Sequence, residues 1–372
     1  MSMIRFINPR TLEEFRGKTC LLRIDLNAKP GREKKFLRVE AVIPTIKILL
    51  KNGVRVVILS HRGRPETVNR KSQIANRKNL SLRPFIPILG KKLNQKVGFL
   101  TNFNVPANGS VFLLENLRFW KEEEKNDADF ARRLAKLGDF YVNDAFAVSH
   151  RKDASVVAIT KYLPSYAGLR LEKEIKNLGG ILKYTTRPFV VVIGGAKVGD
   201  KLGIISYLWK RADYFLLGSG PAATFFAAKG LPIGDSLLDK NSIPKIKKFL
   251  NSKKIILPLD VKIRDKRILD IGDDTARKYC ALIKKSRTVI WNGPVGSFED
   301  KEFSEGTKAV WGAVFANHRA QIVVGGGETL ASLSLIRNSM SLIPKNVFLS
   351  TGGGAMLEYL SGKKLPGIEA LK

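Results

Sequence analysis

Short apolar runs alternate along the chain with segments in which apolar residues recur at helical spacing. The run from Val190 to Ile193 is entirely β-branched and uncharged, which suits a strand buried on both faces of a parallel sheet. After Arg38 the apolar residues keep helical spacing as far as Gly53. Further strands are predicted at 19–26, 54–59, 111–114, 140–142, 214–217, 255–259 and 321–324, and further helices near 81–92, 129–137 and 161–184. This alternation predicts an α/β fold built on doubly wound parallel sheets.

The composition fits two domains of common size. With 372 residues, of which 44% are hydrophobic, the chain is too long for one ordinary core and can fill two. Cys20 and Cys280 lie far apart, which fits a reducing cytosol better than a disulfide framework. The first residues hold no apolar segment of an export signal, and no apolar run approaches ~18 residues. We therefore expect a cytoplasmic protein without a membrane span.

Basic residues greatly outnumber acidic ones. Lys and Arg together number 65 against 33 Asp and Glu, which gives a formal net charge of +32. Such a charge predicts attraction to polyanions in general. The strongest basic run extends from Arg70 to Lys96 and contains no acidic residue. Since no known nucleic-acid motif accompanies this run, a solvated basic surface is favoured over a dedicated nucleic-acid site, and only weak, non-specific polyanion binding is expected.

The apolar run 189–193 ends on a double glycine and then opens a helical pattern. Gly194 and Gly195 let the backbone turn and approach an anion closely, and the first N–H groups of the following helix would be free to bind it. Lys197 and Lys201 are four residues apart and would share one face of that helix. The spacing fits neither the Walker A motif nor the dinucleotide motif G-x-G-x-x-G. The stretch predicts a phosphate site of another kind, with a tight turn and two solvated lysines as the alternative.

Polar and basic side chains gather near the ends of the predicted strands of the first half. Asp25 and Asn27 stand at the end of the first strand, although a D-x-N sequence is also common in turns. His61 and Arg64 follow the strand 54–59 directly, in a loop whose three potential cations would bind an anion; a plain basic loop is the alternative. Arg38 stands near a helix N-terminus, where a cation is disfavoured unless an anion joins it. Because the carboxyl ends of parallel strands share one sheet edge, we expect an anion site there.

Two more arginines, Arg118 and Arg151, follow the later strands of the first half. The motifs of this half are, in order, RIDLNA, LRVEAVIPTI, SHRGRP, LLENLRF and YVNDAFAVSHR. In this order the chain resembles the phosphoglycerate kinase family. In that family the corresponding segments form a basic patch for 3-phosphoglycerate or 1,3-bisphosphoglycerate. The resemblance implies substrate binding by Asp25, Asn27, Arg38, His61, Arg64, Arg118 and Arg151.

The second half carries further motifs of the same family, together with departures from them. WNGPVGSFE is highly specific to the family, and its Glu299 resembles the residue that holds the nucleotide ribose. GGGET carries Glu328 where the family usually has Asp, and STGGGA opens a second phosphate-binding helix. GSGP replaces a glycine-rich loop, the segment 261–275 is abbreviated, and Asp273 replaces a usual proline, although Gly272 still matches.

By the same resemblance the second half binds ATP or ADP together with Mg²⁺. Glu328 would be the carboxylate nearest the metal, and because metal ligation depends on reach, the extra methylene relative to Asp matters. The implied catalytic residues are Arg38, Lys197, Gly353 and Gly354. The implied nucleotide-binding residues are Gly195, Lys201, Gly272, Asn292, Glu299, Gly326, Gly327, Glu328 and Thr329.

The resemblance also implies a domain organisation and a reaction. Residues 1–167 would form the phosphoglycerate domain, to which the tail 358–372 returns, and residues 168–184 would be the helix that leads to the nucleotide domain, 185–357. The reaction would be reversible phosphoryl transfer between 1,3-bisphosphoglycerate and ADP, giving 3-phosphoglycerate and ATP, in glycolysis and gluconeogenesis. Such a transfer needs positioning and charge stabilisation but no general base, since the acid is already ionised. With the two sites on separate domains, the transfer requires a hinge closure that also excludes water.

Two other classes of protein remain open at this point. A nucleic-acid-binding protein would explain the charge but would leave the glycine-rich loops without a purpose. Another acyl-phosphate-forming kinase would explain those loops but not the ordered matches of the first half. We therefore expect a monomeric phosphotransferase with a carboxyl group as acceptor, which uses ATP, ADP and Mg²⁺ and has neither a membrane nor a dedicated nucleic-acid partner.

Overall fold

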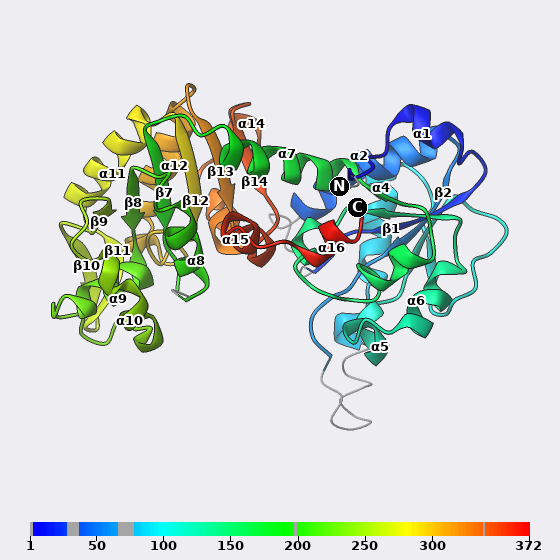
Figure 1. The fold of residues 1–372 in the computed structure, drawn as a ribbon, viewed down its shortest axis with the longest axis horizontal. Helices are drawn as coiled ribbons and strands as arrows, with labels where there is room; N and C mark the ends of the chain where they lie inside the picture. Colours follow the sequence, from blue (N-terminus) through cyan, green and yellow to red (C-terminus); the bar gives the residue numbers. More distant parts are fainter. Residues whose placement is uncertain (1–2, 28–36, 66–77, 197–198, 338) are drawn as a thin grey trace. The chain divides into compact units, whose positions relative to one another are not determined.

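The computed structural model describes residues 3–27, 37–65, 78–196, 199–337 and 339–372. The chain forms two compact units: Met1–Glu174 with Lys364–Lys372, and Ile175–Lys363. Each unit is built on its own six-stranded parallel sheet with helices around it (Figure 1). The predicted α/β class with parallel sheets is therefore confirmed. The division between the units falls within α7 (Leu169–Lys183).

The sheet of the first unit has the strand order β3-β4-β2-β1-β5-β6, and every neighbouring pair is parallel. Its strands are β1 (Thr19–Arg23), β2 (Arg55–Leu59), β3 (Gly98–Leu100), β4 (Val111–Leu114), β5 (Phe140–Asn143) and β6 (Ser165–Ala167). Its helices are α1 (Pro9–Glu13), α2 (Leu37–Lys51), α4 (Ile86–Leu93), α5 (Lys121–Glu124), α6 (Ala128–Ala135) and α16 (Pro366–Glu369), with short 3-10 helices at Arg83–Phe85, Leu117–Phe119, Phe146–Val148 and Ala158–Lys161. Since β1 lies between β2 and β5, the carboxyl ends of these three strands meet at one edge of the sheet.

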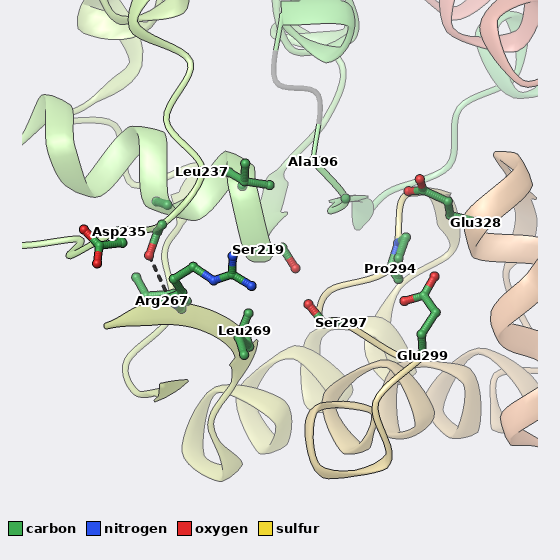
Figure 2. Close-up of a pocket in the computed structure, with 16 residues that line it drawn as sticks. Ala196, Ser219, Asp235, Leu237, Arg267, Leu269, Pro294, Ser297, Glu299 and Glu328 are labelled. Carbon is green, nitrogen blue, oxygen red and sulfur yellow. Dashed lines mark hydrogen bonds between the residues drawn. The ribbon is translucent and has the colours of Figure 1, made fainter. Parts of the chain in front are cut away.

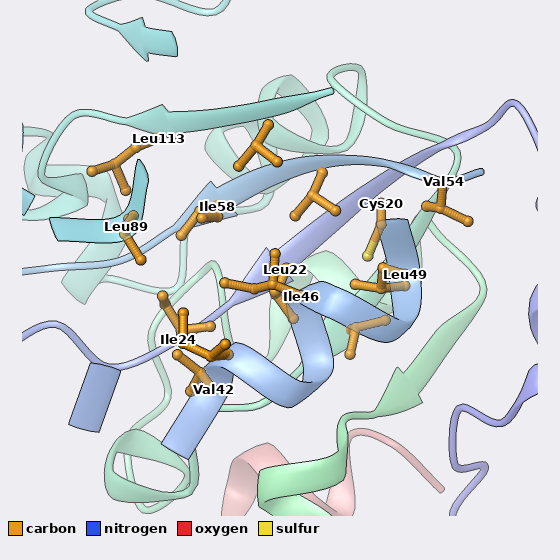
Figure 3. Close-up of a cluster of buried hydrophobic side chains, with 14 of the residues drawn as sticks. Cys20, Leu22, Ile24, Val42, Ile46, Leu49, Val54, Ile58, Leu89 and Leu113 are labelled. Carbon is orange, nitrogen blue, oxygen red and sulfur yellow. The ribbon is translucent and has the colours of Figure 1, made fainter. Parts of the chain in front are cut away.

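Helix α2 covers one face of this sheet through a cluster of buried apolar side chains (Figure 3). Leu22 of β1 and Ile24 just beyond it pack in the same cluster as Val42 and Ile46 of α2, and all four are buried. Side chains alternate across a strand, so Arg23 lies on the opposite face of the sheet from Leu22 and Ile24. The apolar pattern of β1 therefore fixes one face as core and leaves the other for a charged side chain.

The sheet of the second unit has the order β14-β13-β12-β7-β8-β9, again with parallel neighbours. Its strands are β7 (Phe189–Ile193), β8 (Tyr214–Leu217), β9 (Ile255–Ile256), β12 (Thr288–Asn292), β13 (Gln321–Gly325) and β14 (Val347–Ser350), and β10 (Val261–Arg264) and β11 (Arg267–Ile271) form a separate hairpin. Its helices are α8 (Gly199–Leu208), α9 (Ser219–Ala228), α10 (Ile243–Ile246), α11 (Asp273–Lys285), α12 (Glu305–Ala316), α13 (Gly327–Ala331), α14 (Ser339–Leu342) and α15 (Gly354–Leu360), with 3-10 helices at Lys240–Ser242, Lys247–Phe249, Lys301–Phe303 and Ser332–Leu335. Every residue of β7 is buried, which confirms the strand that its β-branched run predicts.

One helix and several strands differ from the pattern-based expectation. The helix predicted over 161–184 begins only at Leu169, and β6 occupies part of its predicted range, so this prediction was wrong in its first third. The pattern also failed to indicate β3 and β14, and β9 is shorter than the predicted strand 255–259. All four of these strands stand last in the strand order of their sheet, and β6 also forms an isolated parallel bridge with Phe6 through Ala167. Among the described residues, no helix is long and apolar enough to cross a lipid bilayer.

Candidate active site

The carboxyl ends of β1 and β2 and the first described turn of α2 are joined by hydrogen bonds. Oδ1 of Asp25 accepts from the N–H of Asn27 at 2.8 Å, and Oδ2 accepts from Nη1 of Arg38. The same Arg38 nitrogen lies 3.2 Å from the carbonyl oxygen of Asn27. Oδ1 of Asn27 in turn accepts from the N–H of Gly63 at 2.9 Å. These bonds bring three segments that are distant in sequence to one place at the sheet edge.

Two arginines with incompletely bonded guanidinium groups lie at the same edge. Nη1 of Arg118 donates to the carbonyl oxygen of Gly63 at 2.5 Å, and Nη2 of Arg118 lies 3.3 Å from Oε1 of Glu124. Arg151 Nη1 lies 3.8 Å from that same carboxylate oxygen. Within the described part of the chain, Nε and Nη2 of Arg118 and Nε of Arg151 are buried and lack a hydrogen bond. Buried donors left without acceptors are costly, so this arrangement suits an anionic ligand.

The remaining residues assigned to this site follow β2. His61 is buried, whereas Arg64 is exposed and has no partner among the residues that the structure describes. Burial lowers the pKa of His61 well below its usual value, and the charges of Arg23, Arg118, Arg151 and Arg38 lower this pKa further. The structure therefore brings His61 together with the arginines of the first half, but as a neutral ring. Its interpretation as a potential cation was wrong, because burial, and after it the four guanidinium groups, disfavour a positive charge on the ring.

A residue that the sequence reading missed, Arg23, determines which nitrogen of His61 carries the proton. Arg23 is fully buried, and its Nη2 lies 3.1 Å from Nδ1 of His61. A guanidinium group has only donors, so Nδ1 must accept and the single proton must lie on Nε2. His61 is thereby a neutral donor held in one orientation at the sheet edge.

We expect the imidazole ring of His61 to remain the neutral Nε2–H tautomer from pH 6 upward. The chain has three histidines, so ¹⁵N spectra of histidine-labelled protein, with His61→Gln for assignment, can follow each ring separately. Because burial and the arginines hold the folded pKa below the unfolded value, His61 contributes stability above about pH 6.5, and that contribution is lost as the pH falls through the folded pKa. An imidazolium signal for His61 at pH 6 would contradict this protonation state.

Arg23 is compensated on its other side by a buried carboxylate. Nε of Arg23 donates to Oγ of Ser155 at 2.9 Å, and this hydroxyl donates to Oε1 of Glu123 at 2.5 Å. Oε2 of Glu123 accepts from the N–H of Ser155 at 3.0 Å. Complete burial raises the pKa of Glu123 to about 7, against the lowering effect of the Arg23 charge. A connected set of side chains thus extends from His61 at the sheet edge to Glu123 in α5.

Substitution of Glu123 should change how stability depends on pH. The folded protein holds the Glu123 proton up to about pH 7, whereas the ordinary value is 4.5, so this group's contribution to the free energy of unfolding is lost as the pH rises between these values. Relative to Glu123→Gln, the wild type should lose up to about 3 kcal/mol across that window. Denaturant titrations at several pH values measure the difference. The control is Glu122→Gln on the same helix, and equal pH slopes for wild type and Glu123→Gln would refute the assignment.

In the second unit, the turn after β7 is built from closely packed backbone. The N–H of Gly195 donates to the carbonyl oxygen of Pro294 at 2.7 Å, and a Cβ on Gly194 would overlap that carbonyl group. Gly195 adopts φ +75°, a conformation that glycine tolerates best. A Cβ at this position would lie 3.0 Å from Nζ of Lys201 and 3.3 Å from Oε2 of Glu328. The turn therefore admits a cation and a carboxylate to the same point of the backbone.

Two adjoining cavities open from this turn. One, of about 360 Å³, is lined by Ala196, Lys201, Asn292, Gly293, Gly326, Gly327, Glu328, Thr329, Gly353 and Leu357. Lys201 is buried, and its Nζ donates to the carbonyl oxygen of Gly194. Oγ1 of Thr329 accepts from the N–H of Gly293 at 2.7 Å, while Nδ2 of Asn292 donates to the carbonyl oxygen of Gly325 at 3.0 Å. These bonds hold the glycine-rich loops after β12 and β13 against each other.

The second cavity, of about 280 Å³, extends from Glu328 past Pro294 and Ser297 toward the β10–β11 hairpin (Figure 2). Gly195, Glu299 and Glu328 all line it, so residues predicted from three separate motifs meet around one space. Its opposite end is formed by residues outside every recognised motif: Asp235, Ser236, Leu237, Arg267, Ile268 and Leu269. No pattern of spacing marked these residues, because a hairpin and a distant loop supply them.

The remaining predicted residues of the second half are Gly272, Gly353, Gly354 and Lys197. Gly272 is the N-cap of α11, where its N–H donates to the carbonyl oxygen of Asp260 at 2.9 Å, and it lines neither cavity. Gly354 begins α15 beside Gly353, which alone of the two lines a cavity. Lys197 lies outside the described residues.

Comparison with known proteins matches this chain along nearly its whole length. The family model described as phosphoglycerate kinase matches residues 11–363. Phosphoglycerate kinase of Borrelia garinii is 39% identical, over 98% of this chain and 98% of its own. That of Moorella thermoacetica is 40% identical, over 96% and 97%. The chain belongs to the phosphoglycerate kinase family.

Solved structures of the family agree with the fold. Phosphoglycerate kinase from Pyrococcus horikoshii superposes with a TM-score of 0.82 at 31% identity, over 99% of this chain and 98% of that one. The enzyme from Coxiella burnetii superposes with a TM-score of 0.79 at 34% identity, over 96% of both. Two parallel-sheet units are therefore a property that this chain shares with phosphoglycerate kinases.

Membership of the phosphoglycerate kinase family establishes the reaction. The chain is a phosphotransferase with a carboxyl group as acceptor, and it transfers a phosphoryl group reversibly between 1,3-bisphosphoglycerate and ADP, giving 3-phosphoglycerate and ATP in glycolysis. Its substrates are thus two phosphoglycerates and two adenine nucleotides. Nucleic-acid binding and the reaction of another acyl-phosphate-forming kinase are therefore no longer alternatives for the main function.

Proposed function

We propose that the first unit binds the phosphoglycerate at the carboxyl edge of its sheet. The observation that carries this proposal is the pair of arginines, Arg118 and Arg151, whose buried donors lack hydrogen bonds among the described residues and whose shared Glu124 carboxylate is half exposed. A carboxylate or phosphate group would supply the acceptors that these donors lack. The complete set of binding residues is Asp25, Asn27, Arg38, His61, Arg64, Arg118 and Arg151.

In this assignment the polar residues of the set orient the arginines and the substrate. Asp25 and Asn27 orient Arg38 and the loop at Gly63, and His61 offers one N–H at a fixed angle. A neutral donor binds an anion at any pH near neutrality without adding charge. Acid binding should therefore depend on the arginines for charge and on His61 for geometry.

The second unit binds the nucleotide in the two adjoining cavities. Glycine-rich backbone beside buried Lys201 suits phosphate groups, and Glu299, which lines the smaller cavity, suits the ribose hydroxyls. The residues assigned to the nucleotide are Gly195, Lys201, Gly272, Asn292, Glu299, Gly326, Gly327, Glu328 and Thr329. Gly272 would affect the nucleotide indirectly, since it contacts Asp260 and lines neither cavity.

Glu328 is the residue that fits a Mg²⁺ ion. Its carboxylate is exposed and lines both cavities. Among the described residues, no group of three or more His, Cys, Asp or Glu side chains could hold a metal. One carboxylate beside phosphate groups is the donor set that Mg²⁺ commonly takes in kinases. Bound there, Mg²⁺ would neutralise charge on the nucleotide phosphates.

Phosphoryl transfer itself requires positive charge and backbone donors at the moving group. Arg38 and Lys197 are assigned to the charge that develops on that group, and Gly353 and Gly354 to the donors at the start of α15. Residues 1–167 with the tail 358–372 are the phosphoglycerate domain, 168–184 the connecting helix and 185–357 the nucleotide domain. Because the sites belong to separate units, transfer requires a hinge closure, which also excludes water. We further propose a monomeric, cytoplasmic enzyme with neither a membrane nor a dedicated nucleic-acid partner.

A coupled assay that starts from 3-phosphoglycerate, ATP and Mg²⁺ tests this assignment. Purified protein should form 1,3-bisphosphoglycerate, detected through its reduction by an excess of a NADH-dependent dehydrogenase. Arg118→Met should raise KM for 3-phosphoglycerate far more than KM for ATP, because Arg118 lies in the first unit. Equal effects on the two KM values, or normal turnover without the acid, would argue against the assigned sites.

A further inference from the structure

A buried carboxylate lies among the arginines of the proposed phosphoglycerate site. Asp153 follows Arg151 by two positions and is only 4% exposed. Within the described part of the chain, its Oδ2 is buried and has no hydrogen-bond partner. An anion site is built from donors and cations, so a negative charge inside it opposes the ligand unless that charge can be removed. None of the motifs or binding residues named above includes Asp153.

The backbone around Asp153 keeps this carboxylate in the interior. The carbonyl oxygen of Asp153 accepts from the N–H groups of Val156 and Val157, both at 2.9 Å. The N–H of the next residue, Ala154, donates to the carbonyl oxygen of Glu123 at 2.8 Å. The turn that begins at Asp153 is therefore bound to α5, and its first side chain stays buried.

Charges of both signs act on the carboxyl group of Asp153. Burial is the largest effect and raises its pKa above the ordinary value. Three arginine charges lower this pKa and one carboxylate charge raises it, and they belong to Arg23 of β1, Arg118, Arg151 and Glu124 of α5. Asp153 in turn raises the pKa of Glu123. Three guanidinium groups and three carboxyl groups thus lie together, so their formal charges cancel before any acid binds.

Glu124 and Asp153 must respond differently when an anion arrives. Glu124 lies 3.3 Å from Nη2 of Arg118 and 3.8 Å from Nη1 of Arg151, and its side chain is 52% exposed. Glu124 can therefore turn toward water and leave these donors to the anion. Asp153 is buried and held, so only a proton can remove its charge. An anion on the same arginines offsets their effect on Asp153 and so favours its protonated form.

On the basis of the proposed phosphoglycerate site, we propose that Asp153 sets the affinity for the acid by opposing its charge and by taking up a proton from solvent when the acid binds. Asp153 acts through Arg118 and Arg151 and is not a catalytic residue. Coupling between two binding events is reciprocal, so protonation of Asp153 strengthens acid binding by the same factor by which the acid favours protonation. Such couplings are typically roughly 5- to 150-fold.

Replacing Asp153 by asparagine should tighten the binding of 3-phosphoglycerate by roughly 5- to 50-fold at about pH 7.5, because the amide carries no opposing charge. Isothermal titration calorimetry on the full chain measures Kd, in buffers free of phosphate and sulfate, since both anions would occupy the same arginines. Asp153→Ser is also neutral and should change Kd in the same direction. The matched control is Asp129→Asn, an exposed residue of α6, which should leave Kd unchanged.

The same titrations, repeated in two buffers of different ionisation enthalpy, count the protons exchanged per acid bound. Between about pH 6 and 7.5 the wild type should take up more protons than Asp153→Asn, by up to about half a proton for a coupling of about 10-fold. The phosphate group of the acid, the Glu123 carboxyl group and the rings of His61 and His150 are present in both proteins. The difference between the two proteins therefore isolates Asp153, and a merely structural role would not produce it.

Unchanged or weaker binding in both neutral variants would overturn the proposal, and so would equal proton uptake by the wild type and Asp153→Asn. Equal tightening by Asp129→Asn would assign the effect to the net charge of the unit instead. Arg118→Met tests the proposed site separately. If that substitution weakens binding of 3-phosphoglycerate while the Asp153 variants change nothing, this inference alone fails. If Arg118→Met leaves binding unchanged, the proposed phosphoglycerate site fails as well.

Discussion

Replacing Arg38 by alanine should lower kcat by roughly 10²- to 10³-fold, the usual cost of one donor to charge that develops in a transition state. Arg38 makes both of its described contacts through one nitrogen, Nη1, to Asp25 and to the carbonyl oxygen of Asn27. Its side chain is 28% exposed, so the rest of the guanidinium group remains open to a substrate. Asp25 thus holds Arg38 in place without using its remaining donors.

Steady-state kinetics with varied 3-phosphoglycerate and ATP distinguish the role of Arg38 in transfer from a role in binding. A fall in kcat with little change in KM is expected, since the charge arises only during transfer. A rise in KM alone would move Arg38 to ground-state binding. Arg10→Ala, an exposed arginine of α1 in the same unit, controls for the loss of one positive charge. The same result is expected for Lys197→Ala, on the strength of the family resemblance.

Replacing Glu328 by alanine should raise the Mg²⁺ concentration needed for half-maximal rate by at least roughly 10- to 100-fold, the loss that follows even when a group supporting a metal ligand is removed. Glu328 lies at the start of α13, and its Oε2 comes close to the Gly195 turn. Among the described residues, it is the acidic side chain that lines both cavities. Of the described residues that line the larger cavity, no other is acidic.

Rates measured over a Mg²⁺ titration at saturating ATP provide this test. Glu328→Asp restores the residue usual in the family and should keep the Mg²⁺ requirement close to that of the wild type if the backbone can bring the shorter side chain to the metal. Glu305→Ala, a solvent-exposed acidic residue of α12, serves as the control. An unchanged requirement in Glu328→Ala would falsify the metal role and make the Asp-to-Glu difference incidental.

The central strands could be predicted from the sequence because an uninterrupted apolar run by itself indicates a buried strand. β1, β2 and β7 lie inside their sheets and are buried almost throughout. The edge strands β3 and β14 are short, each pairs with one strand of its sheet, and parts of both are half-exposed. Their existence depends on the neighbour that they meet, and that neighbour is set by the tertiary fold.

The site divides in a similar way between motif and fold. Asp25, His61 and Glu328 stand in segments whose residue types already indicate anion or metal chemistry. Arg23 gave no such signal, because a charge in an apolar strand indicates nothing until the strand is placed in its sheet. Only the pairing of β1 with β2 puts Arg23 beside His61 and so decides that the ring is neutral.

The amino-acid sequence by itself determined the fold class, the family and the residue types at both sites, because these depend on local periodicity and on motifs in a fixed order. The tertiary structure decided what depends on residues far apart in the chain meeting in space. It set the protonation state of His61 through Arg23 and the raised pKa of Glu123 through burial. Burial and long-range hydrogen bonds control these properties, and neither can be read from spacing along the chain.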